Sequence, residues 1–275
     1  ISRQISFWSK VFNVKGDEWP KILFSWLVRF FYRLGFVLIW TVVVGQFVTN
    51  YGIAALPYLF VFTAFFTLLG SLGSSTVVDR FSPKKMMVVN VLIAALVIAV
   101  TPVFFSPDEP LFIGLLMVTV VLFLKQFRLI LGGYLEELFS PLQSERTFPL
   151  IEAADTIAGV VAGILLATLV DQIELVGLLN IASLSLIVIA PLLFTFVFPE
   201  NVEEDRERSP KRYGLGVYSS LKAQFRDRTY LKFLKGLILL ILLQWFLFNI
   251  LEFQYTKAVY SKTSSVASDY GSGFE

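Results

Sequence analysis

The chain has 275 residues, of which 56% are apolar, 16% aromatic and only 16% charged, and its mean hydropathy is +0.73. Its net charge is +2, and it contains no Cys and no His. Disulfides, thiolate nucleophiles, His-based triads and metal sites built on His or Cys are therefore excluded. The charged fraction is well below the roughly 25% of an average soluble domain, which excludes an ordinary soluble enzyme. We expect an all-α, polytopic membrane protein that is not an enzyme and uses no cofactor.

Long apolar stretches divide the chain. A bilayer core about 30 Å thick needs about 20 apolar residues in a helix, and seven stretches meet this length. They run over residues 22–48, 54–78, 86–105, 111–138, 148–170, 175–198 and 233–251. The connections between the first six are short and carry turn residues such as Gly52 and Pro107. The sequence therefore predicts seven transmembrane helices.

The basic residues are distributed unevenly between the two sides of these spans. If the N-terminus is cytoplasmic, the segments 1–21, 79–85, 139–146 and 199–232 lie inside and hold 16 of the 23 Lys and Arg residues. The first three loops on the opposite side hold none. Because cytoplasmic loops of membrane proteins are enriched in Lys and Arg, we expect a cytoplasmic N-terminus.

Two segments outside the spans have patterns of their own. The segment 5–14, ISFWSKVFNV, is amphipathic, which favours either a helix lying in the membrane interface or a short arm packed on the bundle. The segment 199–232 mixes acidic and basic residues, as is typical of a solvated connector and not of a nucleic-acid site. Its part 218–232 has the spacing of a surface helix, open to lipid headgroups or a partner.

The order of these parts predicts four regions. We expect an N-terminal cytoplasmic or interfacial segment at 1–21, a six-helix bundle at 22–198, a cytoplasmic linker at 199–232, and a seventh helix with its following loop at 233–275. Six spans, a charged linker and a seventh span are typical of the first half of a 6 + 6 transporter. We therefore expect a C-terminal half, either on a longer chain or as a partner subunit, to complete the protein in the lipid bilayer.

The loop between the second and third spans carries a recognisable motif. It reads STVVDRFSPKK from Ser75 to Lys85. This loop resembles the G-x-x-x-D-[RK]-x-G-[RK]-[RK] loop of the major facilitator superfamily, with serines at its two glycine positions. The resemblance implies that fold, and it implies a cytoplasmic gate in which an acid at a helix end pairs with basic groups. The gating residues would be Asp79, Arg80, Lys84 and Lys85.

Further stretches narrow the resemblance. The tripeptide WPK at 19–21 and the pentapeptide ALPYL at 55–59 look like the opening of bacterial relatives of ATP/ADP translocases. RTFPLI at 146–151 resembles that family's joint between spans four and five, and EFQYTKAV at 252–259 resembles the end of its seventh span. The resemblance implies transport of a nucleotide-like anion across a bacterial inner membrane. Relatives of this kind also include proteins that carry regulatory domains.

Six charged residues lie in the interior of the predicted spans, away from the span ends, and a charge at the bilayer centre costs at least about 2.5–3.5 kcal/mol. They form pairs three or four residues apart, so each pair shares one helix face. One interpretation is an anion-binding cavity, with Arg and Lys clamping phosphate or carboxylate oxygens and an acid competing with the substrate or carrying a coupling proton. The other is a buried ion network that only holds the bundle together. The residues are Arg29, Arg33, Lys125, Arg128, Glu152 and Asp155.

Other polar and small residues have candidate roles near the helix ends. Glu136 and its neighbour Glu137 either form a solvated helix end or make a gate ion pair with Arg146 or with the loop around Arg80. Glu252 with Lys257 is a candidate for an outer gate pair. Two groups of glycines permit close helix packing, which we expect inside the bundle and not between copies of the chain. They are Gly132 with Gly133, and Gly159 with Gly163.

Two functions remain open on these grounds. The first is a secondary transporter of an organic anion that works by alternating access. The second is a transport-inactive relative retained as a membrane anchor or as a scaffold subunit of a larger assembly. The stretch 40–46 favours the second, because the translocase family commonly has charged residues there and this chain has none.

Overall fold

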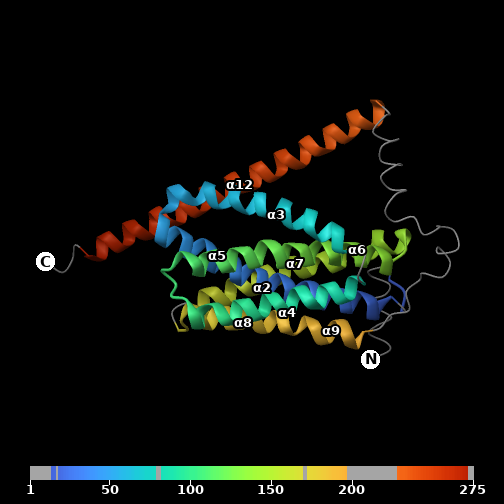
Figure 1. Ribbon diagram of the computed structural model, residues 1–275, viewed down its shortest axis with the longest axis horizontal. Helices are drawn as coiled ribbons and strands as arrows, with labels where there is room; N and C mark the ends of the chain where they lie inside the picture. Colours follow the sequence, from blue (N-terminus) through green and yellow to red (C-terminus); the bar gives the residue numbers. More distant parts are fainter. Residues whose placement is uncertain (1–13, 17, 79–81, 170–171, 197–227, 272–275) are drawn as a thin grey trace. The chain divides into compact units, whose positions relative to one another are not determined.

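The computed structural model describes residues 14–16, 18–78, 82–169, 172–196 and 228–271. In these ranges it contains no strand and has seven helices long and apolar enough to cross a membrane (Figure 1). The predicted all-α polytopic bundle is confirmed. The amphipathic segment 5–14, apart from Val14, and the linker segment up to residue 227 lie outside the described residues.

The chain forms two compact units. The larger unit comprises Ile1–Phe47 and Thr63–Glu203, and the smaller unit comprises Val48–Phe62 and Glu204–Glu275. The helices that contribute to the larger unit are α2 (Trp19–Tyr51), α3 (Leu56–Val78), α4 (Pro83–Phe104), α5 (Pro110–Thr119), α6 (Lys125–Leu138), α7 (Pro141–Leu169), α8 (Leu175–Ile187) and α9 (Ile189–Thr195). A π-helical turn, Val120–Leu124, joins α5 to α6, so these two helices form one span.

Proline and short polar side chains set several helix starts. Proline occupies the first position of α4, α5 and α7, where the missing N–H removes no helical hydrogen bond. Ser82 caps α4, because its Oγ accepts a hydrogen bond from the Lys85 N–H at 3.4 Å. Before α7, the Ser140 N–H donates to Gln143 Oε1 at 3.0 Å. Helix α7 therefore begins at Pro141, two turns before the predicted 148, since its first turns are polar and apolar length alone does not detect them.

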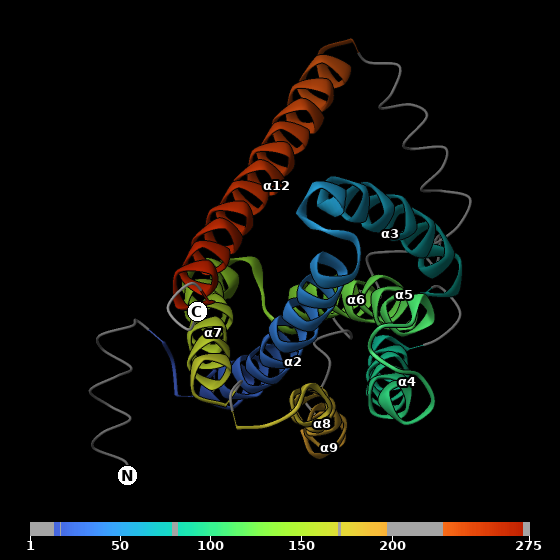
Figure 2. The same ribbon diagram turned by 90° about the vertical axis from the view of Figure 1, so that its left-hand side faces the viewer.

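Helix α2 is surrounded by other helices in the larger unit (Figure 2). It lies between α7 and α6, with α8 at its side. Tyr32 of α2 stacks on Phe127 of α6 with ring centroids 5.1 Å apart. Helix α4 packs against α5, α6, α8 and α9, and Ser183 of α8 donates a hydrogen bond to the Ala95 carbonyl of α4 at 2.9 Å.

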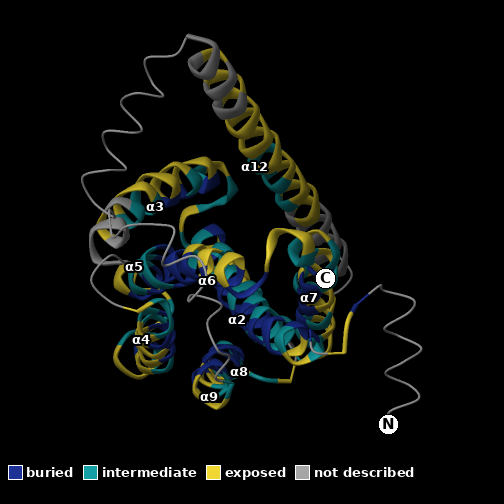
Figure 3. Ribbon diagram, turned by 90° about the vertical axis from the view of Figure 1, so that its right-hand side faces the viewer, coloured by how far each residue is buried: buried dark blue, intermediate teal, exposed yellow. Residues whose placement is uncertain are grey.

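Burial is greatest on the sides of the helices that face one another, and many large apolar side chains on the other sides are exposed (Figure 3). This is the pattern of a bundle whose outer surface contacts lipid.

Glycine allows close helix contact at two positions that the sequence did not suggest. A Cβ on Gly35 of α2 would lie 2.6 Å from Ser185 Oγ of α8, and a Cβ on Gly70 of α3 would lie 2.8 Å from Gln126 Nε2 of α6. The predicted packing glycines behave differently, because nothing lies within 4 Å of a Cβ built on Gly132, Gly133, Gly159 or Gly163. Their expected role in packing inside the bundle is therefore wrong for the described structure.

The smaller unit is built on one long helix. Helix α12 spans Arg228–Gly271, and η1 (Ile53–Ala55) packs near it. Gly52 makes the turn between α2 and η1 with a φ of +77°, which only glycine adopts without strain. The apolar window of α12 is Leu239–Val259, so the seventh helix continues well beyond the predicted end at residue 251.

Candidate functional site

The six intramembrane charges lie on three helices whose ends meet. The start of α2 contacts the end of α6 and the start of α7, because Lys21 Nζ donates to the Leu138 carbonyl and Arg146 pairs with Glu18. We call this side of the bundle the Glu18 end. At about 1.5 Å per residue, all six charges lie about 15–21 Å from it. They therefore occupy one level, well inside helices of 29 to 33 residues.

Four of the six side chains form a cluster of ion pairs. Arg29 Nη1 lies 3.8 Å from Glu152 Oε1 and 3.9 Å from Asp155 Oδ2, and Arg128 Nη2 lies 4.0 Å from the same Asp155 oxygen. We call Arg29, Arg128, Glu152 and Asp155 the ion cluster. One carboxylate oxygen thus faces two guanidinium groups from different helices. All three separations exceed hydrogen-bond length, so the pairs are loose.

The exposure of these side chains is uneven. Arg29 and Asp155 are 17% and 25% exposed, whereas Arg128 and Glu152 are 60% and 65% exposed. A charge at this depth does not face lipid, because the apolar core solvates it poorly. The ion cluster therefore opens toward an aqueous space or toward a covering protein surface.

Arg33 lies on α2 one turn beyond Arg29. Its guanidinium carbon lies 5.5 Å from the centre of the Phe36 ring, and its buried Nε has no hydrogen-bond partner among the described residues. Arg33, Arg128 and Asp155 all lie within electrostatic range of the buried Tyr32 hydroxyl. Arg33 thus adds a donor beside the ion cluster without joining its ion pairs.

Lys125 faces a different neighbour. Its Nζ donates to Thr67 Oγ1 of α3 at 3.1 Å. The next residue, Gln126, is 1% exposed; its Nε2 donates to Ser71 Oγ of α3 at 3.4 Å. The two basic side chains near the start of α6 therefore contact different helices. Arg128 pairs with α7, and Lys125 donates a hydrogen bond to α3.

The π-helical turn immediately precedes this polar part of α6. The Lys125 N–H donates to the Val120 carbonyl, five residues earlier instead of four. A π turn shifts the register of all following side chains relative to a continuous α-helix, and such turns often lie at functional sites. Sequence periodicity did not detect it, because the turn lies within an uninterrupted apolar run.

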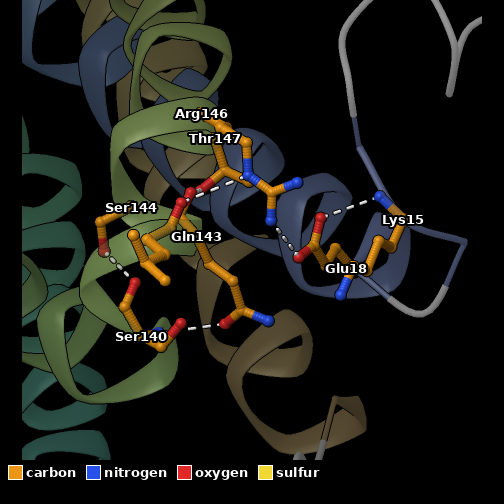
Figure 4. Close-up of polar contacts among 8 residues, drawn as sticks. Lys15, Glu18, Ser140, Gln143, Ser144, Arg146 and Thr147 are labelled. Carbon is orange, nitrogen blue, oxygen red and sulfur yellow. Dashed lines mark hydrogen bonds and ion pairs between the residues drawn. The ribbon is translucent and has the colours of Figure 1, made fainter.

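A further ion pair lies at the Glu18 end (Figure 4). Arg146 Nη2 of α7 is 3.0 Å from Glu18 Oε1, and the Lys15 N–H donates to Glu18 Oε2 at 2.9 Å. The sequence reasoning missed Glu18, although an acid directly before a helix start is a usable signal. It proposed Glu136 as the partner of Arg146. Glu136 is exposed and makes no ion pair with a described residue, since Arg146 extends toward α2 instead.

The remaining predicted gate residues are only partly described. Asp79 and Arg80 lie outside the described residues. Lys84 Nζ lies 5.5 Å from the centre of the Tyr134 ring of α6, and Lys85 is exposed. In the smaller unit, Glu252 and Lys257 form no ion pair with each other, because five residues along a helix separate them by about 140°.

The chain matches one protein family along almost its whole length. Residues 23–270 match the family model of the Major Facilitator Superfamily. No curated protein and no solved structure gives a match to the chain. The predicted resemblance to this superfamily is confirmed, and the match extends from the first long helix to the last. The chain therefore belongs to the major facilitator superfamily, a family of membrane transporters.

Proposed function

We propose that this chain forms the substrate-binding part of a secondary transporter for an organic anion that works by alternating access. The observation that carries the proposal is the ion cluster, where α2, α6 and α7 bring four charges together deep in apolar helices and leave Arg128 and Glu152 largely exposed. A purely structural network would be better buried. The motifs that resemble ATP/ADP translocases support a nucleotide-like substrate. The same resemblance supports a bacterial inner membrane, and the distribution of basic residues supports a cytoplasmic N-terminus.

The arrangement of charges supports a competition mechanism. Arg33, Lys125 and Arg128 offer donors to phosphate or carboxylate oxygens, and arginine binds such groups with two parallel hydrogen bonds. Asp155 faces both Arg29 and Arg128 at 3.9 and 4.0 Å. An incoming anion displaces Asp155 from Arg128 while Arg29 keeps it in place. Because the chain has no His, Glu152 and Asp155 are the carboxyl groups at this site suited to carry a coupling proton.

Residues near the ends of the apolar stretches are proposed as gates. Asp79, Arg80, Lys84 and Lys85 would act at the cytoplasmic end, where Arg146 and Glu136 also lie. Glu252 and Lys257 would act as gate residues in the seventh helix, but they would not pair with each other.

Substitution of Arg128 tests the proposal most directly. In proteoliposomes with the full natural polypeptide, uptake of labelled ATP, ADP, inorganic phosphate and succinate is measured for wild type and for Arg128→Gln. We expect about tenfold or greater loss of uptake, because a charge-assisted hydrogen bond to the substrate contributes about 1.5–3 kcal/mol. Lys15→Gln is the control, since it removes an exposed positive charge outside the site. It should leave uptake unchanged.

The scaffold alternative predicts a different result. No anion in the panel would enter faster than in protein-free liposomes, and Arg128→Gln would lower the amount of protein in the membrane instead of a transport rate. That outcome would make the ion cluster a structural network and overturn the transport proposal.

A further inference from the structure

Tyr32 places a hydroxyl group among the charges of the proposed anion site. It lies on α2 three residues after Arg29 and directly before Arg33, and its side chain is buried. Its hydroxyl lies within electrostatic range of Arg33, of Arg128 on α6 and of Asp155 on α7. Because α2 lies between α6 and α7 (Figure 2), this one neutral polar group faces charges from all three helices.

The ring of Tyr32 is held against α6. It stacks on Phe127 with ring centroids 5.1 Å apart and an angle of 26° between the two planes. The other contact between these helices joins Lys21 to the Leu138 carbonyl. Eleven residues separate the two contacts along α2, from 21 to 32, and along α6, from 127 to 138. The antiparallel helices therefore keep one register, and Arg128, directly after Phe127, lies at the level of Tyr32.

The charges around the hydroxyl limit where its proton can go. Guanidinium groups only donate hydrogen bonds, so Arg33 and Arg128 cannot accept the Tyr32 proton. Asp155 can accept it, and so can an anion bound to the two arginines. An anion that displaces Asp155 from Arg128 takes over the position of that acceptor. Because a buried hydroxyl without a partner is costly, the bound anion is then the natural acceptor for Tyr32.

We propose that Tyr32 is a substrate-binding residue whose hydroxyl donates a hydrogen bond to the anion held by Arg33 and Arg128. This inference rests on the proposed anion transport and adds a neutral donor to the site. A hydrogen bond to an ionised oxygen is stronger than one to a neutral oxygen. Tyr32 therefore strengthens anion binding without placing another costly charge in the apolar core. Hydropathy does not single it out, because a tyrosine within an apolar run leaves the run intact.

Removal of the hydroxyl alone tests this role. Binding of inorganic phosphate to the full natural polypeptide in detergent is measured by titration calorimetry, together with the melting temperature, for wild type and for Tyr32→Phe. We expect Tyr32→Phe to bind phosphate about tenfold or more weakly, as for other lost hydrogen bonds to charged groups. Its melting temperature should stay unchanged, because the variant keeps the ring that stacks on Phe127. Tyr58→Phe, at an exposed position of α3, is the control and should bind phosphate like wild type.

A second substitution separates a bond to the anion from a bond to the protein. If the hydroxyl bonds to the anion, Tyr32→Phe should weaken phosphate binding by a similar factor when Asp155→Ala is also present. If Asp155→Ala does not fold, Asp155→Leu fills the space for the same comparison. A loss that disappears without Asp155 would show that the hydroxyl only orients this carboxylate, and it would overturn the inference. Equal phosphate affinity of wild type and Tyr32→Phe would overturn it too and leave anion binding standing. If wild type binds no phosphate, the proposed anion site fails, and this role of Tyr32 fails with it.

Discussion

Glu18 and Arg146 form an unequal pair at the Glu18 end. The Glu18 side chain is 1% exposed and the Arg146 side chain 28% exposed. Loss of the arginine leaves a buried carboxylate without its cation, whereas loss of the carboxylate leaves an arginine that reaches water by a small rotation. The two residues therefore contribute differently to stability although they share one 3.0 Å contact.

Single and double substitutions measure this difference. We expect Arg146→Met to lower the free energy of unfolding by about 3 kcal/mol and Glu18→Gln by about 1 kcal/mol, because an unpaired buried charge is the more costly defect. Thermal unfolding in detergent gives both values. The double variant should be more stable than the sum of the single effects predicts. Strict additivity would show that the two side chains do not interact.

At the scale of helices, the contact between α2 and α8 depends on one missing side chain. Gly35 lies so close to Ser185 and Leu186 that its Cβ would meet them at 2.6 and 3.0 Å. Both neighbours are buried, so neither moves aside easily. The spacing of these two helices is therefore set by the absence of a methyl group.

Substitution by alanine tests this contact with a control in the same chain. Gly35→Ala should destabilise the protein by about 1–3 kcal/mol through overpacking. Gly133→Ala should be neutral or stabilise it by up to about 1 kcal/mol, because alanine favours the helix and nothing lies within 4 Å of the added Cβ. Comparable melting temperatures for both variants would contradict the close approach at Gly35.

Apolar length predicted the helices well, and its failures have identifiable causes. The stretch predicted at 175–198 is confirmed as one span, Leu175–Thr195, although a turn at Val188 divides its backbone into α8 and α9. The polar start of α7 and the length of α12 were missed because hydropathy reports contact with lipid and not helical conformation. The π turn before Lys125 leaves the composition of its span unchanged and is visible only in backbone hydrogen bonds.

For the candidate site, the sequence predicted the members and not their partners. Pairs such as Glu152 and Asp155 stand out because charges are costly in a membrane, and their depth follows from residue counting. The pairing of carboxylates with guanidinium groups depends on how α7 is rotated about its axis relative to α2 and α6. A single sequence does not reveal this rotation. The pairing of Arg146 with Glu18, 128 residues away, was missed for the same reason.

For the whole molecule, the orientation in the membrane remains a prediction from the basic residues. The chain has no native Cys, so single-cysteine variants give an unambiguous readout. On intact cells, a membrane-impermeant maleimide should label Ser106→Cys and should label Ser140→Cys only after lysis. Both positions are exposed at helix ends. Labelling of Ser140→Cys on intact cells, with Ser106→Cys protected, would reverse the orientation.

Helices α2, α6 and α7 are linked to one another at two heights. At the Glu18 end, Lys21 reaches the end of α6 and Glu18 reaches α7. About 15–21 Å away, Arg29 and Arg128 both face Asp155. A single contact between two helices allows them to rotate about it, whereas contacts at two separate positions along the helices prevent both rotation and sliding. The three helices are thus expected to move as one rigid body, so a displacement of the ion cluster would be carried to the Glu18 end.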